Sequence, residues 1–113
     1  MVVTITSLKL RHLWGYFPLT YLALWVTLQV YKQKGFIKFK NTGFGYDHYT
    51  LTAWESEADM KSFSRTGAHV DAMKHAKKLA QEVRILTYKS NALPSWKEVK
   101  KLLAEKADRV VTF

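Results

Sequence analysis

The residue of this 113-residue chain best placed to do chemistry is His69. Small or apolar residues follow it at +3, +4, +7 and +11, which is the spacing of one helical face: Ala72, Met73, Ala76 and Ala80. A neutral imidazole on such a face can ligate iron, accept a proton from a phenol or enol, or hydrogen-bond a carbonyl group. We therefore take His69 as the candidate catalytic base or iron ligand, with a purely structural histidine as the alternative.

The surroundings of His69 favour a pocket. The residue falls in the first turn of its helix, where the helix dipole disfavours the imidazolium form. Alanines on the same face leave space, and Met73 supplies an adaptable wall. The competing interpretation is that Trp54, Phe63 or the first helix fills this space as ordinary core.

The candidate ligand-binding residues are aromatic or flank this face. They are Trp54, Phe63, Met73, Trp25, Tyr21 and His48. His48 shares a strand face with Thr50 and Thr52, so it can point into the same cavity. The sequence has no cysteine, no GxSxG or HExxH motif and no phosphate-binding glycine loop, and its histidines are scattered singly, so we expect no metal site apart from His69 if haem binds.

The central segment places His69 after a strand and a short helix. Residues 50–54 alternate with a period of two, and the pattern becomes helical at Ser56, which we expect to cap the helix with Asp59 in the capping-box position. Gly67 interrupts that helix, and a second helix begins near Ala68.

The first third of the chain contains a strand at residues 2–10 and a long uncharged segment at residues 13–30. A helix from Pro18 to Gln33 would be about 24 Å long, which is short of the ~30 Å hydrocarbon core of a bilayer. We therefore predict a buried helix in a cytoplasmic protein rather than a membrane span or signal peptide. A helix apolar on nearly all sides still requires a second cover, from a subunit, a greasy ligand or a membrane surface.

The remaining elements complete an α+β pattern. We predict a hairpin of residues 35–40 and 47–54 around a loop at 41–46, in which Phe44 and Tyr46 either line a pocket mouth or simply pack. A strand at 83–89, a helix capped by Ser95 and Glu98, and an apolar ending at 109–113 that pairs or frays follow. The order predicts a single ferredoxin-like βαββαβ domain over residues 1–113 with an extra C-terminal helix, whose second sheet face a stacked homodimer would cover.

The net charge of +9 has several interpretations. The lysines cluster on two predicted helices, at 74–78 and 97–106, without the interleaved aromatic or glycine pattern of a nucleic-acid surface. A solvated face is favoured, attraction to an anionic membrane or ligand comes second, and we expect no nucleic-acid partner.

The chain resembles a known superfamily in three places. They are the junction from Leu51 to Ser56 followed by Phe63, the Gly-Ala-His-x-x-Ala-Met run at 67–73, and the Leu-Pro-Ser-Trp run at 93–96. These resemble the dimeric α+β-barrel proteins related to antibiotic-biosynthesis monooxygenases, and within them the DUF3291-like branch described as similar to spheroidene monooxygenase. The resemblance implies a homodimer with a pocket between sheet and helices in each subunit.

The same resemblance implies several activities. Some members oxidise polyketide-like aromatics with O2 and neither metal nor flavin, some bind and open haem, and some have no known activity. The haem-degrading members carry an Asn, a Trp and a His at positions that fall near Thr6 or Ser7, on Phe63 and near Met73, so this sequence departs from their pattern. Haem binding would instead rely on His69.

We therefore expect a monooxygenase-like oxidoreductase acting on an apolar or aromatic small molecule, with either no cofactor or haem. The alternatives are a non-enzymatic module that binds a haem-like or isoprenoid ligand, with a membrane surface as a further partner, and a homodimer whose pocket is filled by its own side chains.

Overall fold

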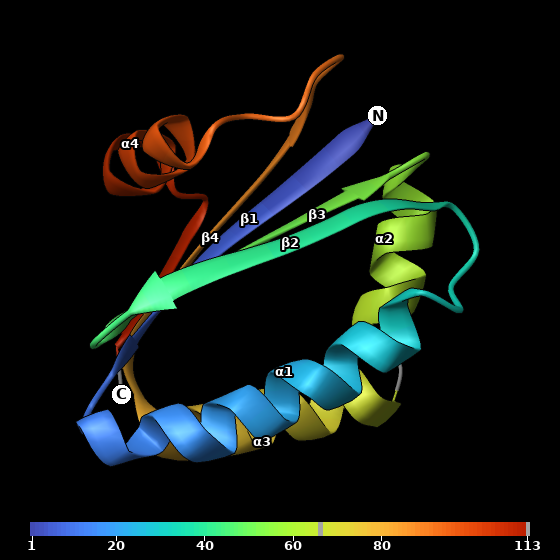
Figure 1. Ribbon diagram of the computed structural model, residues 1–113. Helices are drawn as coiled ribbons and strands as arrows, with labels where there is room; N and C mark the ends of the chain where they lie inside the picture. The colour runs from blue at the N-terminus through green and yellow to red at the C-terminus, as the bar shows by residue number, and fades with distance from the viewer. Residues whose placement is uncertain (66, 113) are drawn as a thin grey trace.

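The computed structural model describes residues 1–65 and 67–112, with the side chains of residues 44, 67–69, 71, 72 and 76 left out of the description. An antiparallel sheet has the strand order β2-β3-β1-β4-β5. Its strands are β1 (Val2–Leu10), β2 (Phe36–Phe44), β3 (Asp47–Trp54), β4 (Ala80–Lys89) and β5 (Arg109–Thr112). Helices α1 (Tyr16–Val30), α2 (Glu57–Ser64) and α3 (Gly67–Leu79) lie on one side of the sheet, and α4 (Trp96–Lys106) lies on the other (Figure 1). This arrangement confirms the predicted ferredoxin-like α+β fold with an extra helix.

Both predicted helix caps are present. The hydroxyl of Ser56 accepts a hydrogen bond from the backbone N–H of Asp59 at 3.2 Å and donates one to the Asp59 carboxylate at 2.9 Å. Ser95 accepts from the backbone N–H of Glu98 at 3.2 Å. Each serine satisfies an N–H group that has no partner inside its own helix, so the sequence marks both helix starts correctly.

Strand boundaries depart from the sequence prediction in two places, and a third, the C-terminal ending, follows one of the two predicted alternatives. The prediction of a loop at 41–46 is wrong, because β2 continues to Phe44. Only Gly45 and Tyr46 form the turn, with Gly45 at φ 64°. Strand β4 begins at Ala80, three residues before its predicted start at Val83. The ending pairs with β4 as an edge strand, with Val83 opposite Val111, so pairing rather than fraying is observed up to residue 112.

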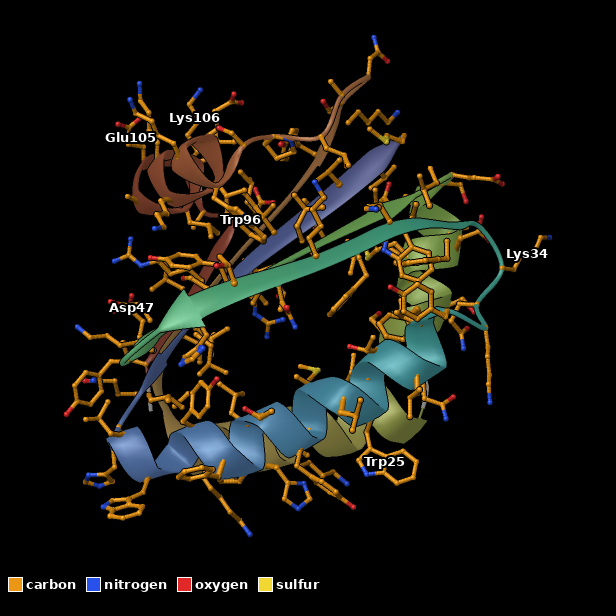
Figure 2. All side chains as sticks on the ribbon, viewed as in Figure 1. Trp25, Lys34, Asp47, Trp96, Glu105 and Lys106 are labelled. Atoms are coloured by element: carbon orange, nitrogen blue, oxygen red, sulfur yellow. The ribbon has the colours of Figure 1, made fainter. Side chains whose placement is uncertain are left out.

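The C-terminal helix covers the face of the sheet that was expected to need a second subunit. Val99 and Leu103 of α4 pack on Val3, Ile5 and Leu51, all at most 2% exposed. Trp96 lies between α4 and the sheet (Figure 2). The apolar centre of this face is therefore covered within one chain, because core residues of β1 and of both its neighbours, among them Val3, Leu51 and Leu86, belong to the same cluster as Val99 and Leu103.

The prediction of a buried first helix is wrong. Within α1 only Val30 is buried, where it joins Trp54 and Phe63 in a small cluster. Trp14 is 81% exposed and Phe17 67% exposed. One side of α1 faces the sheet and α3, and the other side faces outward (Figure 1). None of the helices in the described residues is long and apolar enough to cross a membrane.

Candidate functional site

A cavity of about 540 Å³ lies between the inner side of α1 and strands β1 to β3. Its lining residues come from four elements. They are Thr6, Leu8, Tyr16, Leu19, Thr20, Ala23, Leu24, Thr27, Asn41, Thr42, Gly43, His48, Tyr49 and Thr50. The volume falls within the ~300–1,000 Å³ typical of small-molecule pockets, so the space suits an organic ligand.

The helix wall of the cavity is apolar in effect. Its residues recur at helical spacing from Tyr16 to Thr27, which places them on one side of α1. The hydroxyl of Thr20 donates to the Tyr16 carbonyl at 2.8 Å, and that of Thr27 donates to the Ala23 carbonyl at 2.6 Å. Because both hydroxyls bond their own helix backbone, this wall offers a ligand mainly hydrocarbon.

The sheet wall carries the polar groups. Thr6 of β1 lies opposite Thr50 of β3, and Thr50 lies opposite Asn41 of β2, so the strand register aligns these three residues in one row. Within the described residues, none of the three side chains is hydrogen-bonded to another protein group. Their hydroxyl and amide groups are available to orient an oxygen or nitrogen of a ligand against the apolar wall.

His48 stands at one end of the cavity. Its Nε2 lies 3.0 Å from the carbonyl oxygen of Gly45, and its ring centroid lies 5.6 Å from that of Tyr16. A Cβ atom at Gly43 would lie 2.9 Å from the Cα of His48 and would collide with Nδ1, so glycine at 43 leaves room for the imidazole. If Nε2 carries the proton, it donates to Gly45 and leaves Nδ1 with the lone pair.

The structure separates the other predicted site residues from this cavity. Trp54 and Phe63 stack at 5.3 Å between centroids in the buried cluster beside it. Tyr21 and Trp25 form an edge-to-face pair at 6.3 Å on the outer side of α1, and both are exposed. Met73 is exposed on α3. None of these five lines the cavity.

The side chain of His69 lies outside the described residues, as do those of Ala68, Ala72 and Ala76, so the face on which the sequence prediction rests stays a prediction. Phe44 is likewise outside the description. In the described part of the chain, the indole Nε1 of Trp54 is the one buried side-chain polar atom without a hydrogen-bond partner. Such an atom costs about 1–3 kcal/mol when it stays unpaired.

Sequence reasoning missed the residues that form most of the cavity. Tyr16, Thr20, Ala23 and Thr27 share the helical spacing i, i+4, i+7, i+11, a signal that is visible in the sequence. The spacing does not stand out in the sequence, because the remaining sides of the helix also carry apolar residues. The row of Thr6, Thr50 and Asn41 has no sequence signal, because it depends on strand register.

Two tyrosines on the α4 side of the sheet have perturbed pKa values. Burial, and secondarily the charge of Asp47, raises the pKa of the Tyr49 phenol, whose ring also lies 5.3 Å from the Lys100 ammonium. Burial, then the charge of Glu98, raises the pKa of Tyr88. Both rings therefore stay protonated further into alkali than free tyrosine. No cluster of three or more His, Cys, Asp or Glu placed to hold a metal ion occurs among the described residues.

Comparison with known proteins identifies the fold. No family model matches the sequence, and no curated protein matches it significantly. A candidate antibiotic biosynthesis monooxygenase from Deinococcus radiodurans superposes with a TM-score of 0.74 at 13% identity, covering 84% of this chain and 97% of its own. A conserved protein from Methanosarcina mazei Go1 gives 0.74 at 12% identity, covering 80% and 92%.

A third structure, SnoaB from Streptomyces nogalater, is a cofactor-independent oxygenase. It superposes with a TM-score of 0.69 at 8% identity, covering 83% of this chain and 97% of its own. These likenesses show that the chain shares the ferredoxin-like α+β fold of those structures. At such low identity they define the fold alone, and they do not single out the DUF3291-like branch.

Proposed function

We propose that this protein is a cofactor-independent, monooxygenase-like oxidoreductase that binds an apolar or aromatic small molecule in the cavity under α1. The observation that carries the proposal is the two-sided lining: a hydrocarbon wall from α1 faces the polar row of Thr6, Thr50 and Asn41. The likeness of fold to SnoaB, a cofactor-independent oxygenase, supports it. A homodimer is part of the same proposal and is tested by sedimentation equilibrium.

The reaction class needs no external reductant. A methylene group between activated aromatic rings loses a proton, and the resulting carbanion reduces O2 and combines with it. Loss of water from the peroxide leaves a carbonyl group, so one oxygen atom enters the product and the other leaves as water. The substrate supplies all four electrons.

Different residues of the cavity lining would have different roles in that reaction. Thr6, Thr50 and Asn41 would hydrogen-bond the oxygen on which charge develops when the substrate loses its proton. His48, with its tautomer set by the Gly45 carbonyl, would accept that proton at Nδ1. His69 is the second candidate base, on the sequence argument alone.

The described lining of the cavity contains a single imidazole, that of His48. Its Nε2 lies 3.0 Å from the Gly45 carbonyl oxygen and its ring lies against Tyr16, so the proposal assigns His48 to proton transfer and not to iron. The proposed reaction uses no haem, and His69 remains the predicted iron ligand for the haem-binding alternative.

The test is oxygen uptake with metal-free protein and a panel of anthrone-like and phenolic substrates. Wild-type protein should consume one O2 per carbonyl formed. His48→Ala should lower kcat by roughly 10²–10⁴-fold if His48 is the base. The exposed His12, which lies outside the cavity, provides a matched control: His12→Ala should leave the rate unchanged.

A cavity-filling variant tests the site independently of its chemistry. Ala23→Phe places a ring in the space beside Thr27 and should abolish substrate binding, whereas Ala104→Phe on the exposed side of α4 should not. Turnover by Ala23→Phe at the wild-type rate would show that the reaction occurs elsewhere. Loss of turnover in His69→Ala alone, with His48→Ala active, would move the base to the α3 helix.

A further inference from the structure

The outer side of α1 presents a continuous stripe of large apolar side chains. Its members run from the 3₁₀ turn Leu13–Gly15 to the residue that follows the helix. They are Trp14, Phe17, Tyr21, Trp25, Leu28 and Tyr31, each between 48% and 81% exposed. We call this stripe the outer α1 surface. Figure 2 shows Trp25 pointing away from the sheet.

This surface is not ordinary solvent-facing helix. Soluble domains usually expose large apolar residues singly, and contiguous patches mark a contact with a partner or a membrane. Four of the six residues are Trp or Tyr, whose rings combine an apolar body with a polar N–H or O–H. Such rings are enriched at the boundary between hydrocarbon and water in a bilayer.

Charge around the outer α1 surface is predominantly positive. The first 46 residues contain no Asp or Glu, and Arg11, Lys32 and Lys34 flank the two ends of the helix. Helix α3, which packs beside α1, adds the exposed Lys74, Lys77 and Lys78 and the single acid Asp71 (Figure 1). A surface of this charge complements an anionic lipid headgroup layer.

We propose that the outer α1 surface docks onto an anionic phospholipid bilayer, with α1 lying in the plane of the interface. At 1.5 Å per residue the 15-residue helix is about 22 Å long. Its apolar stripe would enter the boundary between headgroups and acyl chains while the flanking lysines and Arg11 contact the phosphates. The proposal does not depend on the proposed function of the cavity.

A second copy of this chain fits the same surface less well. A two-fold contact would set one outer α1 surface against an identical one, so the basic ends and the α3 lysines of the two copies would face each other. Like charges brought together across an interface weaken it. A bilayer containing anionic lipid reverses the sign of that interaction.

The test is flotation of the whole protein with unilamellar vesicles of phosphatidylcholine alone or mixed with phosphatidylglycerol. We expect the protein to bind the mixed vesicles. Its affinity for vesicles of phosphatidylcholine alone should be lower by roughly tenfold or more. Salt at about 1 M, where the Debye length is about 3 Å, should release much of the protein. Brominated lipids should quench the fluorescence of Trp14 and Trp25 on binding.

Two variants of equal charge change provide the decisive comparison. Lys77→Glu with Lys78→Glu, on α3, should weaken binding to the mixed vesicles by roughly tenfold or more. Lys97→Glu with Lys101→Glu, on α4 across the sheet, lowers the net charge equally and should leave binding nearly unchanged. Tyr21→Ser with Trp25→Ser should remove the Trp25 contribution to the brominated-lipid quenching and weaken binding to the mixed vesicles, while circular dichroism stays that of the wild type.

Three results would overturn the proposal. The first is no binding of wild-type protein to phosphatidylglycerol vesicles, and the second is an equal loss of binding in the α3 and α4 lysine variants. The third is a lipid-free dimer that Tyr21→Ser with Trp25→Ser converts to a monomer, without vesicle binding by the wild type. That result would assign the outer α1 surface to a second copy of the chain.

Discussion

The rings of Tyr16 and His48 lie 5.6 Å apart, tilted by 42°, and join the first turn of α1 to the start of β3. Both residues line the cavity, so this contact closes the end of it that lies beside the β2–β3 turn. The imidazole is held there from the other side by the carbonyl of Gly45. The position of His48 therefore depends on a helix and a hairpin that are distant in the sequence.

Gly43→Ala should displace the His48 ring, because the new methyl group would collide with Nδ1 and lie 2.9 Å from the His48 Cα. Overpacking of this kind typically costs about 1–3 kcal/mol of unfolding free energy. The measurement is the NMR shift of the His48 ring protons together with urea unfolding. An unchanged His48 spectrum would contradict the arrangement of β2 and β3 described above.

Two glycines with positive φ form a matched pair. Gly35 has φ 78°, and a Cβ there would strike the side chain of Asp59; Gly45 has φ 64° and nothing within 4 Å. Gly45→Ala should cost about 1–2 kcal/mol from the left-handed backbone alone. Gly35→Ala should cost more, because Asp59 must also leave the Ser56 cap. Equal losses in denaturant unfolding would show that Asp59 relaxes freely.

Because α4 covers the sheet, we expect truncation of a leucine on α4 to lower the unfolding free energy more than truncation of a leucine on the outer α1 surface. Leu103→Ala removes a side chain that is 2% exposed and should lower the unfolding free energy by about 2–5 kcal/mol. Leu28→Ala on the outer α1 surface, at 51% exposure, should change it by less than ~0.5 kcal/mol in lipid-free solution. Chemical unfolding at several protein concentrations measures both. A concentration-dependent loss for Leu28→Ala would indicate a subunit on α1 instead.

Alkaline pH should destabilise the fold through the two tyrosines beneath α4. Burial raises the pKa of Tyr49 and Tyr88 in the folded protein, with Asp47 and Glu98 adding to it. Above the unfolded tyrosine pKa of about 10, the folded state holds more protons than the unfolded state, so stability falls as pH rises toward the folded pKa values. Urea unfolding across this window measures the slope. Tyr49→Phe with Tyr88→Phe should reduce it, and an unchanged slope would locate the titrating groups elsewhere.

Several elements follow from local sequence. The alternation of residues 2–10 predicts β1 with its observed bounds, and Ser56 and Ser95 mark the starts of α2 and α4. These signals depend on residues within about four positions of one another, so local geometry is sufficient to read them. The order of the elements then limits the sheet to the ferredoxin-like arrangement, since short antiparallel connections allow few others.

The uncharged segment at residues 13–30 shows that local sequence does not predict the burial of a helix. Residues 13–30 predict a buried helix, but one chain provides cover for only one side of α1, and the stripe from Trp14 to Tyr31 stays exposed. Hydropathy reports that a side chain prefers an apolar environment; it does not report which molecule supplies that environment.

By itself, the sequence determined the element types, both serine caps, the sign of the charge around α1 and the fold class. Only the tertiary structure decided that α4 covers the sheet, that Trp54 and Phe63 stack in the core, and that Thr6, Thr50 and Asn41 align beside His48. The reason is physical. Strand register and helix placement are fixed by contacts between residues far apart in the chain, and a shift of one residue in register would send each of those side chains to the opposite face of the sheet.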